Sequence, residues 1–152
     1  MTEQVKDIFD SIDGWFEIAK PNHTIEDACV QTGCHYEEVA EMALALGDTY
    51  ESEEISRLAD NYKGVGIGHI DTLKHLSNEE KVEDLDSICD QMVTLIGRAR
   101  FMGYDLKPAL EEVNASNYSK FENGAPVFNE QGKIAKGKDF FRPDLTKFIN
   151  KE

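Results

Sequence analysis

Two segments with helical periodicity carry carboxylates at positions where a buried helix normally carries apolar side chains. Glu41 is the only polar residue between Val39 and Leu46, and Asp86 and Asp90 are spaced i and i+4 beside a second apolar stripe. Burying an unpaired carboxylate costs several kcal/mol, so such groups are normally neutralised, paired or bound to a metal. No basic residue lies close by in either segment. Both segments are therefore predicted to be core helices with acids that need a partner.

A shared divalent cation would satisfy both segments together. Glu38 and Glu41 are one helical turn apart, as are Asp86 and Asp90, so each pair can present two oxygens to one ion. Cores of helical bundles are a common place for such sites. Ligand sets made of oxygen alone favour Mg²⁺ or Mn²⁺ over zinc. The four acids are therefore the predicted metal ligands.

Other readings of these acids remain. A di-iron site needs the Glu-x-x-His motif on two helices, and that motif does not occur in the sequence. His35 lies six residues before Glu41 and is expected to be a core or surface residue rather than a ligand. The remaining alternative is that the acids are solvent-facing charges at the edges of their helices.

Periodicity and end signals predict about five helices. Thr24 with Asp27 and Ser77 with Glu80 have the spacing of capping boxes, and Gly33 marks a bend in the second helix. The glycine-rich segment 63–68 is predicted to be a loop; a phosphate loop is not expected there, because the flanking strand and helix are missing. The predicted helices cover about 3–19, 24–46, 51–62, 78–102 and 105–114 or beyond.

The sequence after residue 118 has a different character. The turn signals Asn123-Gly124 and Gln131-Gly132 predict an irregular or hairpin-like arm. The chain has a net charge of -14, but residues 119–152 hold seven of its 16 basic residues against five acids. The predicted fold class is therefore all-α: a helical bundle over 1–118 that contains the metal site, and a basic C-terminal arm of the same domain over 119–152.

Composition excludes several classes. No apolar run reaches about 18 residues, and no signal peptide is apparent. We therefore expect a cytoplasmic protein and not a membrane protein. The acidic balance argues against nucleic acid as a partner. The cysteines are odd in number, lack CxxC spacing and fall in helical patterns, so core thiols are expected at Cys29, Cys34 and Cys89.

An acidic body with a basic arm suits a polyphosphate substrate. Metal ions can bridge phosphate oxygens, orient a water molecule and stabilise charge on a leaving pyrophosphate, while lysines contact the phosphates. Charge alone leaves a second reading of the arm open, in which it is a solvated extension.

Five short motifs resemble one family. Residues 35–41 (HYEEVAE) resemble the EExxE motif of the MazG-like, all-α nucleoside triphosphate pyrophosphohydrolases, and residues 86–90 (DSICD) resemble their second acidic motif. Residues 116–121 (SNYSKF), 132–137 (GKIAKG) and 143–145 (PDL) resemble the signature of the phage-type branch, which is similar to phosphoribosyl-ATP pyrophosphohydrolase. The resemblance spans about residues 10–146.

The resemblance implies Mg²⁺-dependent cleavage of a nucleoside triphosphate between its α and β phosphates. The family's metal ligands, part of its catalytic centre, correspond to Glu38, Glu41 and Asp90. Glu37 matches the first glutamate of EExxE and is a candidate for orienting the attacking water, although an inert surface acid is equally compatible. The family usually assembles as homodimers or homotetramers.

One departure leaves the metal stoichiometry open. Many members carry Glu-x-x-Asp in the second motif, and Ser87 occupies the glutamate position here. The fourth ligand is then Asp86, with Glu83 in reserve on the same helical face. The same departure sustains an alternative function, a non-catalytic helical protein that binds nucleotides or a partner.

The arm supplies the candidate substrate-binding residues. An asparagine amide can bond a sugar or a base edge, and lysines can contact phosphate oxygens. Trp15 lies on an apolar helical face and is predicted to be a core residue rather than a platform for a base. The predicted substrate-binding residues are Asn117, Lys120, Lys133 and Lys136.

Overall fold

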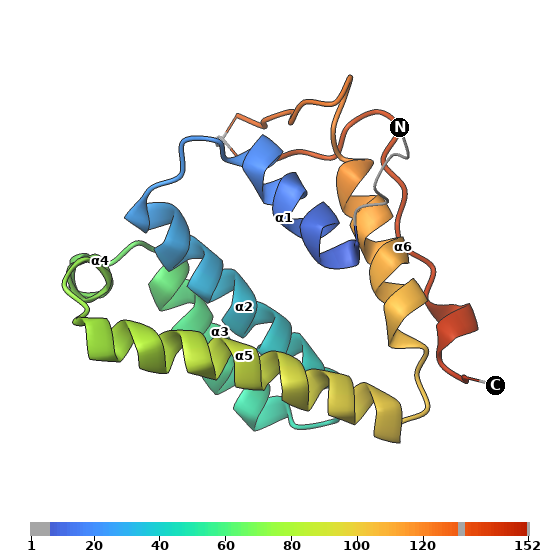
Figure 1. Cartoon of the computed structure of the whole chain (residues 1–152), viewed down its shortest axis with the longest axis horizontal. Coiled ribbons are helices and arrows are strands. Elements are labelled where there is room, and N and C mark those ends of the chain that lie inside the picture. Colours follow the sequence, from blue (N-terminus) through green and yellow to red (C-terminus); the bar gives the residue numbers. More distant parts are fainter. Residues whose placement is uncertain (1–6, 131–132, 152) are drawn as a thin grey trace. The chain divides into compact units, whose positions relative to one another are not determined.

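The chain is all-α, as predicted. A computed structural model describes residues 7–130 and 133–151, and its elements are labelled in Figure 1. The described residues hold two isolated antiparallel bridges, Glu122 with Ala125 and Phe128 with Ile134, and no strand. The helices are α1 (Ile8–Ala19), α2 (Ile25–Ala45), α3 (Thr49–Lys63), α4 (Ile67–Lys74), α5 (Asn78–Phe101), α6 (Leu106–Tyr118) and a short 3₁₀ helix, η1 (Thr146–Phe148).

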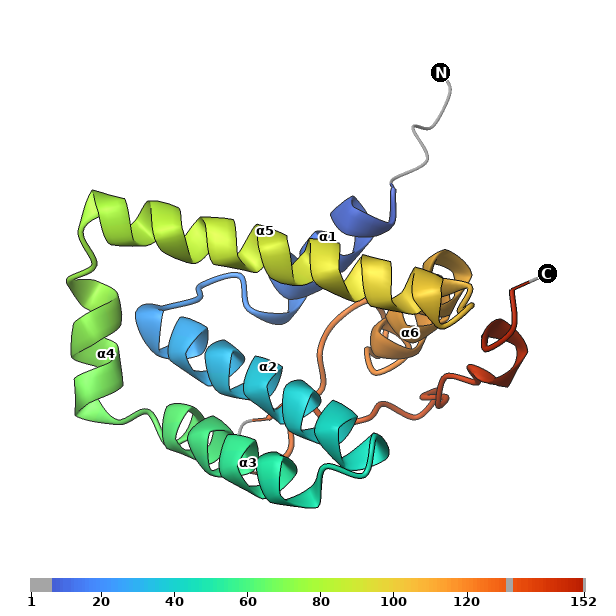
Figure 2. The same cartoon turned by 90° about the horizontal axis from the view of Figure 1, so that it is seen from below.

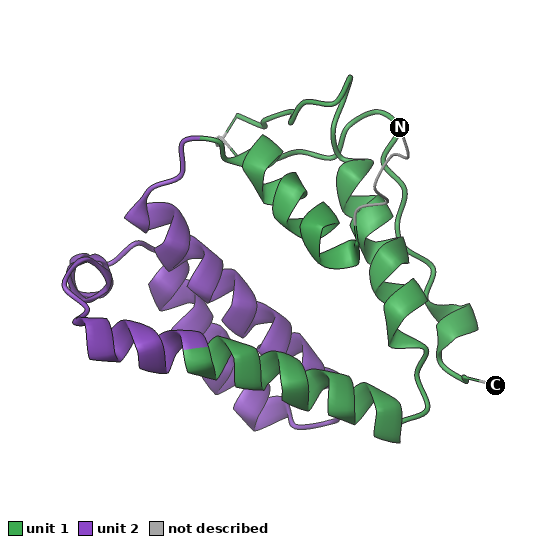
Figure 3. Cartoon of the chain, viewed as in Figure 1, with its two compact units in different colours: residues 1–21, 86–152 green, residues 22–85 purple. Residues whose placement is uncertain are grey.

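The chain divides into two compact units, which Figure 3 distinguishes by colour. Unit 1 comprises residues 1–21 and 86–152, and unit 2 comprises residues 22–85. The boundary at residue 86 falls inside α5, so this helix contributes to both units. Unit 1 therefore contains α1, most of α5, α6 and the C-terminal arm, whereas unit 2 contains α2, α3 and α4.

Both predicted capping boxes are present. The Thr24 backbone N–H donates to the Asp27 carboxylate at 2.9 Å at the start of α2. The Ser77 backbone N–H donates to the Glu80 carboxylate at 2.8 Å, and Ser77 Oγ accepts from the Glu80 N–H at 3.2 Å. These bonds satisfy backbone donors that a helix N-terminus leaves without an intrahelical partner. Helix α5 ends at Phe101, and Gly103, with a φ of +75°, follows it.

Unit 2 is built on a hairpin of α2 and α3, with α4 at one end of the pair (Figure 2). Ser52 Oγ on α3 donates to the carbonyl of Ala40 at 2.8 Å, and Cys29 Sγ donates to the carbonyl of Tyr62 at 3.3 Å. The Tyr62 ring stacks on His69 of α4 with ring centroids 4.0 Å apart. Small buried residues and one aromatic stack thus hold the three helices together.

Gly33 lets α3 approach α2 closely. A Cβ atom at this position would lie 2.7 Å from the Ala59 carbonyl oxygen and 2.9 Å from the Lys63 backbone nitrogen. A bend at Gly33 stays a prediction, and α2 continues through this residue as one helix. The absence of a side chain at Gly33 serves helix packing.

Gly33→Ala is expected to lower the free energy of unfolding by about 1–3 kcal/mol, because the added methyl group overlaps backbone atoms of α3 that cannot rotate away. Gly97→Ala is the matched control: nothing lies within 4 Å of its added Cβ, and alanine favours a helix interior over glycine by up to ~1 kcal/mol. Urea unfolding followed by circular dichroism measures both changes. Equal losses at the two positions would contradict the close approach of α2 and α3.

Unit 1 contains α1 packed on α6, and the arm closes onto the same core. Trp15 of α1 stacks on Phe121 with centroids 5.4 Å apart and the rings 8° from parallel. Trp15 Nε1 donates to the carbonyl of Asn117 at 2.9 Å, and the Tyr118 hydroxyl donates to the carbonyl of Ser11 at 2.7 Å. Trp15 is half-buried, so the prediction that it is a core residue is confirmed in part.

The structure corrects three predictions. Residues 63–68 are not all loop, because α4 begins at Ile67 and includes Gly68. Cys29 is buried, but Cys34 is half-buried and Cys89 is exposed, so Cys29 is the one fully buried thiol. The first helix begins at Ile8, capped by the Asp7 side chain, and the part of the prediction before residue 7 lies outside the described residues.

Over the described part of the chain, no helix combines the length and apolar character that crossing a membrane requires.

Candidate metal and nucleotide-binding residues

Glu38 and Glu41 lie on the face of α2 that points away from α3. The residues that α2 buries against its neighbours are Cys29, Gly33, Ala40 and Ala43, and helical geometry places them on one side. Both glutamates are exposed, and Leu44 beside them is 58% exposed. The prediction that this part of α2 is buried on nearly all sides is wrong, because the helix packs along one face.

Glu37 lies at the edge of the contact between α2 and α3 and forms an ion pair across it. Its carboxylate forms an ion pair with Lys63, the last residue of α3. The hydrogen bond that Lys63 Nζ donates to the Glu37 carboxylate raises the pKa of Lys63 above its ordinary value. A raised lysine pKa contributes stability at all pH values below the ordinary one and loses it as the pH rises through the raised value, so the pair is intact at neutral pH.

Asp86 and Asp90 form the second pair, on the part of α5 that belongs to unit 1. Both are exposed, and α5 continues through them without interruption. Ser87, which holds the position of the family's glutamate, accepts a hydrogen bond at its Oγ from Gln91 Nε2 at 3.3 Å. The spacing of one turn leaves the two aspartates as neighbours along one side of the helix.

The predicted ligands are thus divided evenly between the units. Glu38 and Glu41 belong to unit 2, and Asp86 and Asp90 belong to unit 1. Among the described residues, no three His, Cys, Asp or Glu side chains converge in a group that could hold a metal ion. Carboxylate oxygens are donors of the kind that Mg²⁺ prefers in proteins.

Asn117 and Lys120 are brought together at the end of α6. Lys120 Nζ donates to Asn117 Oδ1 at 2.9 Å and lies 6.0 Å from the centroid of the Trp15 ring. The backbone N–H of Gly137 donates to the Lys120 carbonyl at 2.9 Å, which places residues 136 and 137 beside Lys120. Three of the four predicted substrate-binding residues, those at 117, 120 and 136, therefore lie in one part of unit 1.

Lys136 and Lys133 differ in their surroundings. Lys136 Nζ lies 5.0 Å from the centroid of the Phe140 ring, a cation–π contact. Lys133 is exposed, and its backbone N–H donates to Asn129 Oδ1 at 2.9 Å in the turn between residues 129 and 133.

The serines of the SNYSKF motif are structural residues that the prediction missed. Ser116 Oγ donates to the carbonyl of Phe141 at 2.8 Å, and Ser119 Oγ accepts from the Phe141 N–H at 3.2 Å. Lys138 N–H donates to the Glu122 carboxylate at 2.8 Å. These contacts fasten the returning arm to the end of α6, and the i, i+3 spacing of the two serines is the signal in the sequence.

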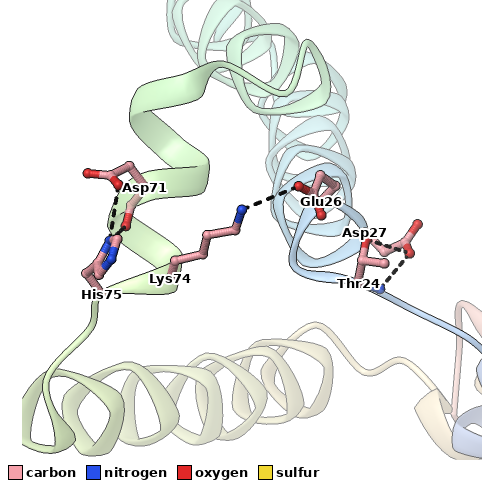
Figure 4. A network of polar contacts seen from close by, with 6 residues as sticks. All are labelled: Thr24, Glu26, Asp27, Asp71, Lys74 and His75. Carbon is pink, nitrogen blue, oxygen red and sulfur yellow. Dashed lines mark hydrogen bonds and ion pairs between the residues drawn. The ribbon is translucent and has the colours of Figure 1, made fainter.

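A separate open groove of about 290 Å³ lies in unit 2, between the start of α2 and α4. Figure 4 shows its polar contacts: Lys74 Nζ lies 3.8 Å from the Glu26 carboxylate, and His75 Nδ1 lies 3.1 Å from the Asp71 carboxylate. The backbone at the start of α2 and the Thr24 hydroxyl lower the pKa of Glu26, with a smaller effect of Lys74. The groove contains none of the predicted site residues.

Comparison with known proteins found no matching family model, no matching curated protein and no matching solved structure.

Proposed function

We propose that this protein is a Mg²⁺-dependent nucleotide pyrophosphohydrolase of the MazG-like, all-α type. It would hydrolyse a nucleoside triphosphate between the α and β phosphates to a nucleoside monophosphate and pyrophosphate. Two exposed carboxylate pairs carry the proposal: Glu38 with Glu41 on α2, and Asp86 with Asp90 on α5. The members of each pair are one helical turn apart, and the C-terminal arm of the same chain gathers basic residues. The motif resemblance in the acidic segments and in the arm supports the same activity.

Glu38, Glu41, Asp86 and Asp90 would hold the metal ion, with Mn²⁺ as a substitute. When bound, the ion would supply positive charge that stabilises the leaving pyrophosphate. The four carboxylates would hold the ion. Glu37 would orient the attacking water molecule, a role that competes with its ion pair to Lys63.

Asn117, Lys120, Lys133 and Lys136 would bind the nucleotide. Asn117 positions the ammonium group of Lys120 through their hydrogen bond, and the Trp15 ring beside it favours a cation at this place. Lysine contacts to phosphate are charge-assisted and are stronger than neutral hydrogen bonds. The hydrogen bonds of Ser116 and Ser119 to the Phe141 backbone hold the arm at the end of α6, and Lys136 of this arm would contact a phosphate.

The active form would be a homodimer or a homotetramer. Large apolar side chains are exposed on α5, including Val82, Leu85 and Val93, each more than 60% exposed. Exposed apolar surface on this scale marks an interaction site in soluble proteins.

A second candidate is a helical protein that binds nucleotides or a partner without turnover. Ser87 in place of the family's glutamate favours it, because one metal ligand is lost there. Pyrophosphate release from a panel of ribo- and deoxyribonucleoside triphosphates with Mg²⁺ separates the two functions. The proposal expects release that depends on the metal and on Asp90, whereas nucleotide binding by calorimetry without release would support the second candidate.

Mg²⁺ or Mn²⁺ is expected to raise the melting temperature without nucleotide, because the two carboxylates of each one-turn pair repel each other until a cation binds. An ion at ten times its dissociation constant adds about 1.4 kcal/mol, which corresponds to a shift of roughly 3–5 °C for a chain of this size. Differential scanning fluorimetry measures the shift, with equal ionic strength of NaCl as the control. A melting curve unmoved by both ions, or moved equally in Glu41→Gln/Asp90→Asn, would contradict the site.

A further inference from the structure

Lys63, the last residue of α3, is held in place by contacts within unit 2. A Cβ atom at Gly33 of α2 would lie 2.9 Å from the Lys63 backbone nitrogen, so the two helix backbones approach closely here. The neighbouring Tyr62 ring meets the Tyr36 ring of α2 with centroids 5.7 Å apart. Cys29 Sγ, also on α2, donates to the Tyr62 carbonyl at 3.3 Å. The backbone from which the Lys63 side chain starts is therefore fixed relative to α2.

The Lys63 side chain runs along α2 over one helical turn. Its Cγ atom lies in the space that a side chain at Gly33 would fill, 2.7 Å from the position of a Cβ atom there. Its ammonium group reaches the Glu37 carboxylate, four residues further along α2. Residues spaced i and i+4 lie on the same side of a helix. The missing side chain at Gly33 thus provides the path for a lysine stem that ends at Glu37.

The ion pair restricts the rotamers available to Glu37. The side chain of Lys63 is 27% exposed and that of Glu37 is 49% exposed, so water screens the pair only in part. Lys63 contacts Oε2 of the carboxylate. A carboxylate has two oxygens with about four lone-pair sites, so Oε1 can still accept a hydrogen bond from a water molecule. The ion pair therefore competes with water for one oxygen and leaves the other as an acceptor in a fixed orientation.

Glu37 belongs to the same acidic segment as the proposed metal ligands of α2. Glu41 lies one turn after Glu37 on the same side of the helix, and Glu38 is the next residue. Like charges spaced i and i+4 destabilise a helix, and the ammonium group of Lys63 offsets this repulsion. Lys63 also lies at the C-terminal end of α3, where the helix dipole favours a cation. The pairing is thus favourable for both helices.

We propose that Lys63 is a positioning residue, which orients the Glu37 carboxylate and through it the water molecule that attacks the nucleotide. The inference rests on the proposed function for the role of Glu37, and it adds a residue that neither acidic motif contains. In this role Lys63 contacts neither the substrate nor the reacting atoms. Loss of its charge should therefore lower kcat rather than raise KM.

The first test observes the Glu37 side chain in the full-length protein without nucleotide or metal. Scalar couplings across its Cα–Cβ and Cβ–Cγ bonds, measured by NMR, should indicate one dominant rotamer in the wild type and averaging in Lys63→Met. This substitution keeps an apolar stem beside Gly33 and removes the ammonium group. Lys74→Met is the matched control, since it removes a lysine that pairs with Glu26 of the same helix, and it should leave the Glu37 couplings unchanged. Averaged couplings in the wild type, or identical couplings in Lys63→Met, would overturn the positioning role.

The second test measures kcat and KM for the nucleoside triphosphate with Mg²⁺. Lys63→Met should lower kcat about tenfold and change KM less than about twofold, whereas Lys63→Arg should retain kcat within about threefold, because a guanidinium group also pairs with a carboxylate. In a Glu37→Gln background, Lys63→Met should have no further effect, since it acts through Glu37.

The outcomes of this second test separate the role of Lys63 from the proposed function. An unchanged kcat in Lys63→Met, or an equal loss with and without Glu37→Gln, would overturn the role of Lys63 while the hydrolase activity stands. A wild type with a fixed Glu37 rotamer and no turnover would contradict the proposed function and with it this role, and would leave only the ion pair.

Discussion

Glu41→Gln is expected to reduce turnover of the nucleoside triphosphate at least ~100-fold while leaving the fold intact, because a metal ligand that supplies several kcal/mol of transition-state stabilisation is lost. Glu41 is exposed on the face of α2 opposite the α3 contact, so the substitution removes no packing. Stability without metal should therefore change little. Initial rates of pyrophosphate release with Mg²⁺ measure the effect on turnover.

The matched control for this prediction is Glu53→Gln, which neutralises an exposed carboxylate on α3 in the same unit. It should retain the wild-type rate. Near-normal turnover in Glu41→Gln would show that α2 does not supply the metal ligand, whatever the activity of the protein.

Phe121→Ala should lower the free energy of unfolding of unit 1 by about 3 kcal/mol, since it removes a buried aromatic side chain and leaves a cavity. Phe121 is 8% exposed, stacks on Trp15, and meets Tyr118 edge-on with centroids 5.9 Å apart. The Trp15 fluorescence change in urea reports directly on this contact.

Phe128→Ala serves as the control within the same arm. Because Phe128 is 51% exposed, this substitution should lower the free energy of unfolding by less than ~1 kcal/mol. Equal, small effects at both positions would show that the arm is a solvated extension rather than part of the core of unit 1. A large effect at Phe121 alone would establish that the arm cannot be removed without damage to the helices it covers.

Local signals predicted the helices well where a cap accompanied the periodic pattern. Thr24 with Asp27, and Ser77 with Glu80, located two helix starts because side-chain capping depends on residues only three positions apart. Helix α4 was missed for the same local reason. Its start at Ile67 has no side-chain cap, and the glycines on both sides favour a loop.

Burial was harder to predict than secondary structure. An apolar run shows that a helix has apolar surface, but not which neighbour covers it. In unit 2, α3 packs on the small residues Gly33, Ala40 and Ala43 and leaves Leu44 exposed. The premise that Glu41 is buried failed because small residues, rather than the large ones, make this contact.

The candidate site was predictable only in its parts. Periodicity places Glu38 with Glu41, and Asp86 with Asp90, because each pair is separated by one turn of one helix. It carries no information on how helices far apart in sequence are paired. In the arm, the motif around Asn117 and Lys120 located two contacting residues, while the structural roles of its serines required the contacts to Phe141.

Phosphorus NMR of the products tests the central claim most directly, because it identifies which phosphate bond is broken. Full-length protein incubated with Mg²⁺ and a nucleoside triphosphate should yield pyrophosphate and the nucleoside monophosphate in equal amounts, with no diphosphate intermediate, and Asp90→Asn should yield neither. Release of inorganic phosphate and nucleoside diphosphate, or a spectrum in which every nucleotide of the panel stays intact, would contradict the proposed pyrophosphohydrolase.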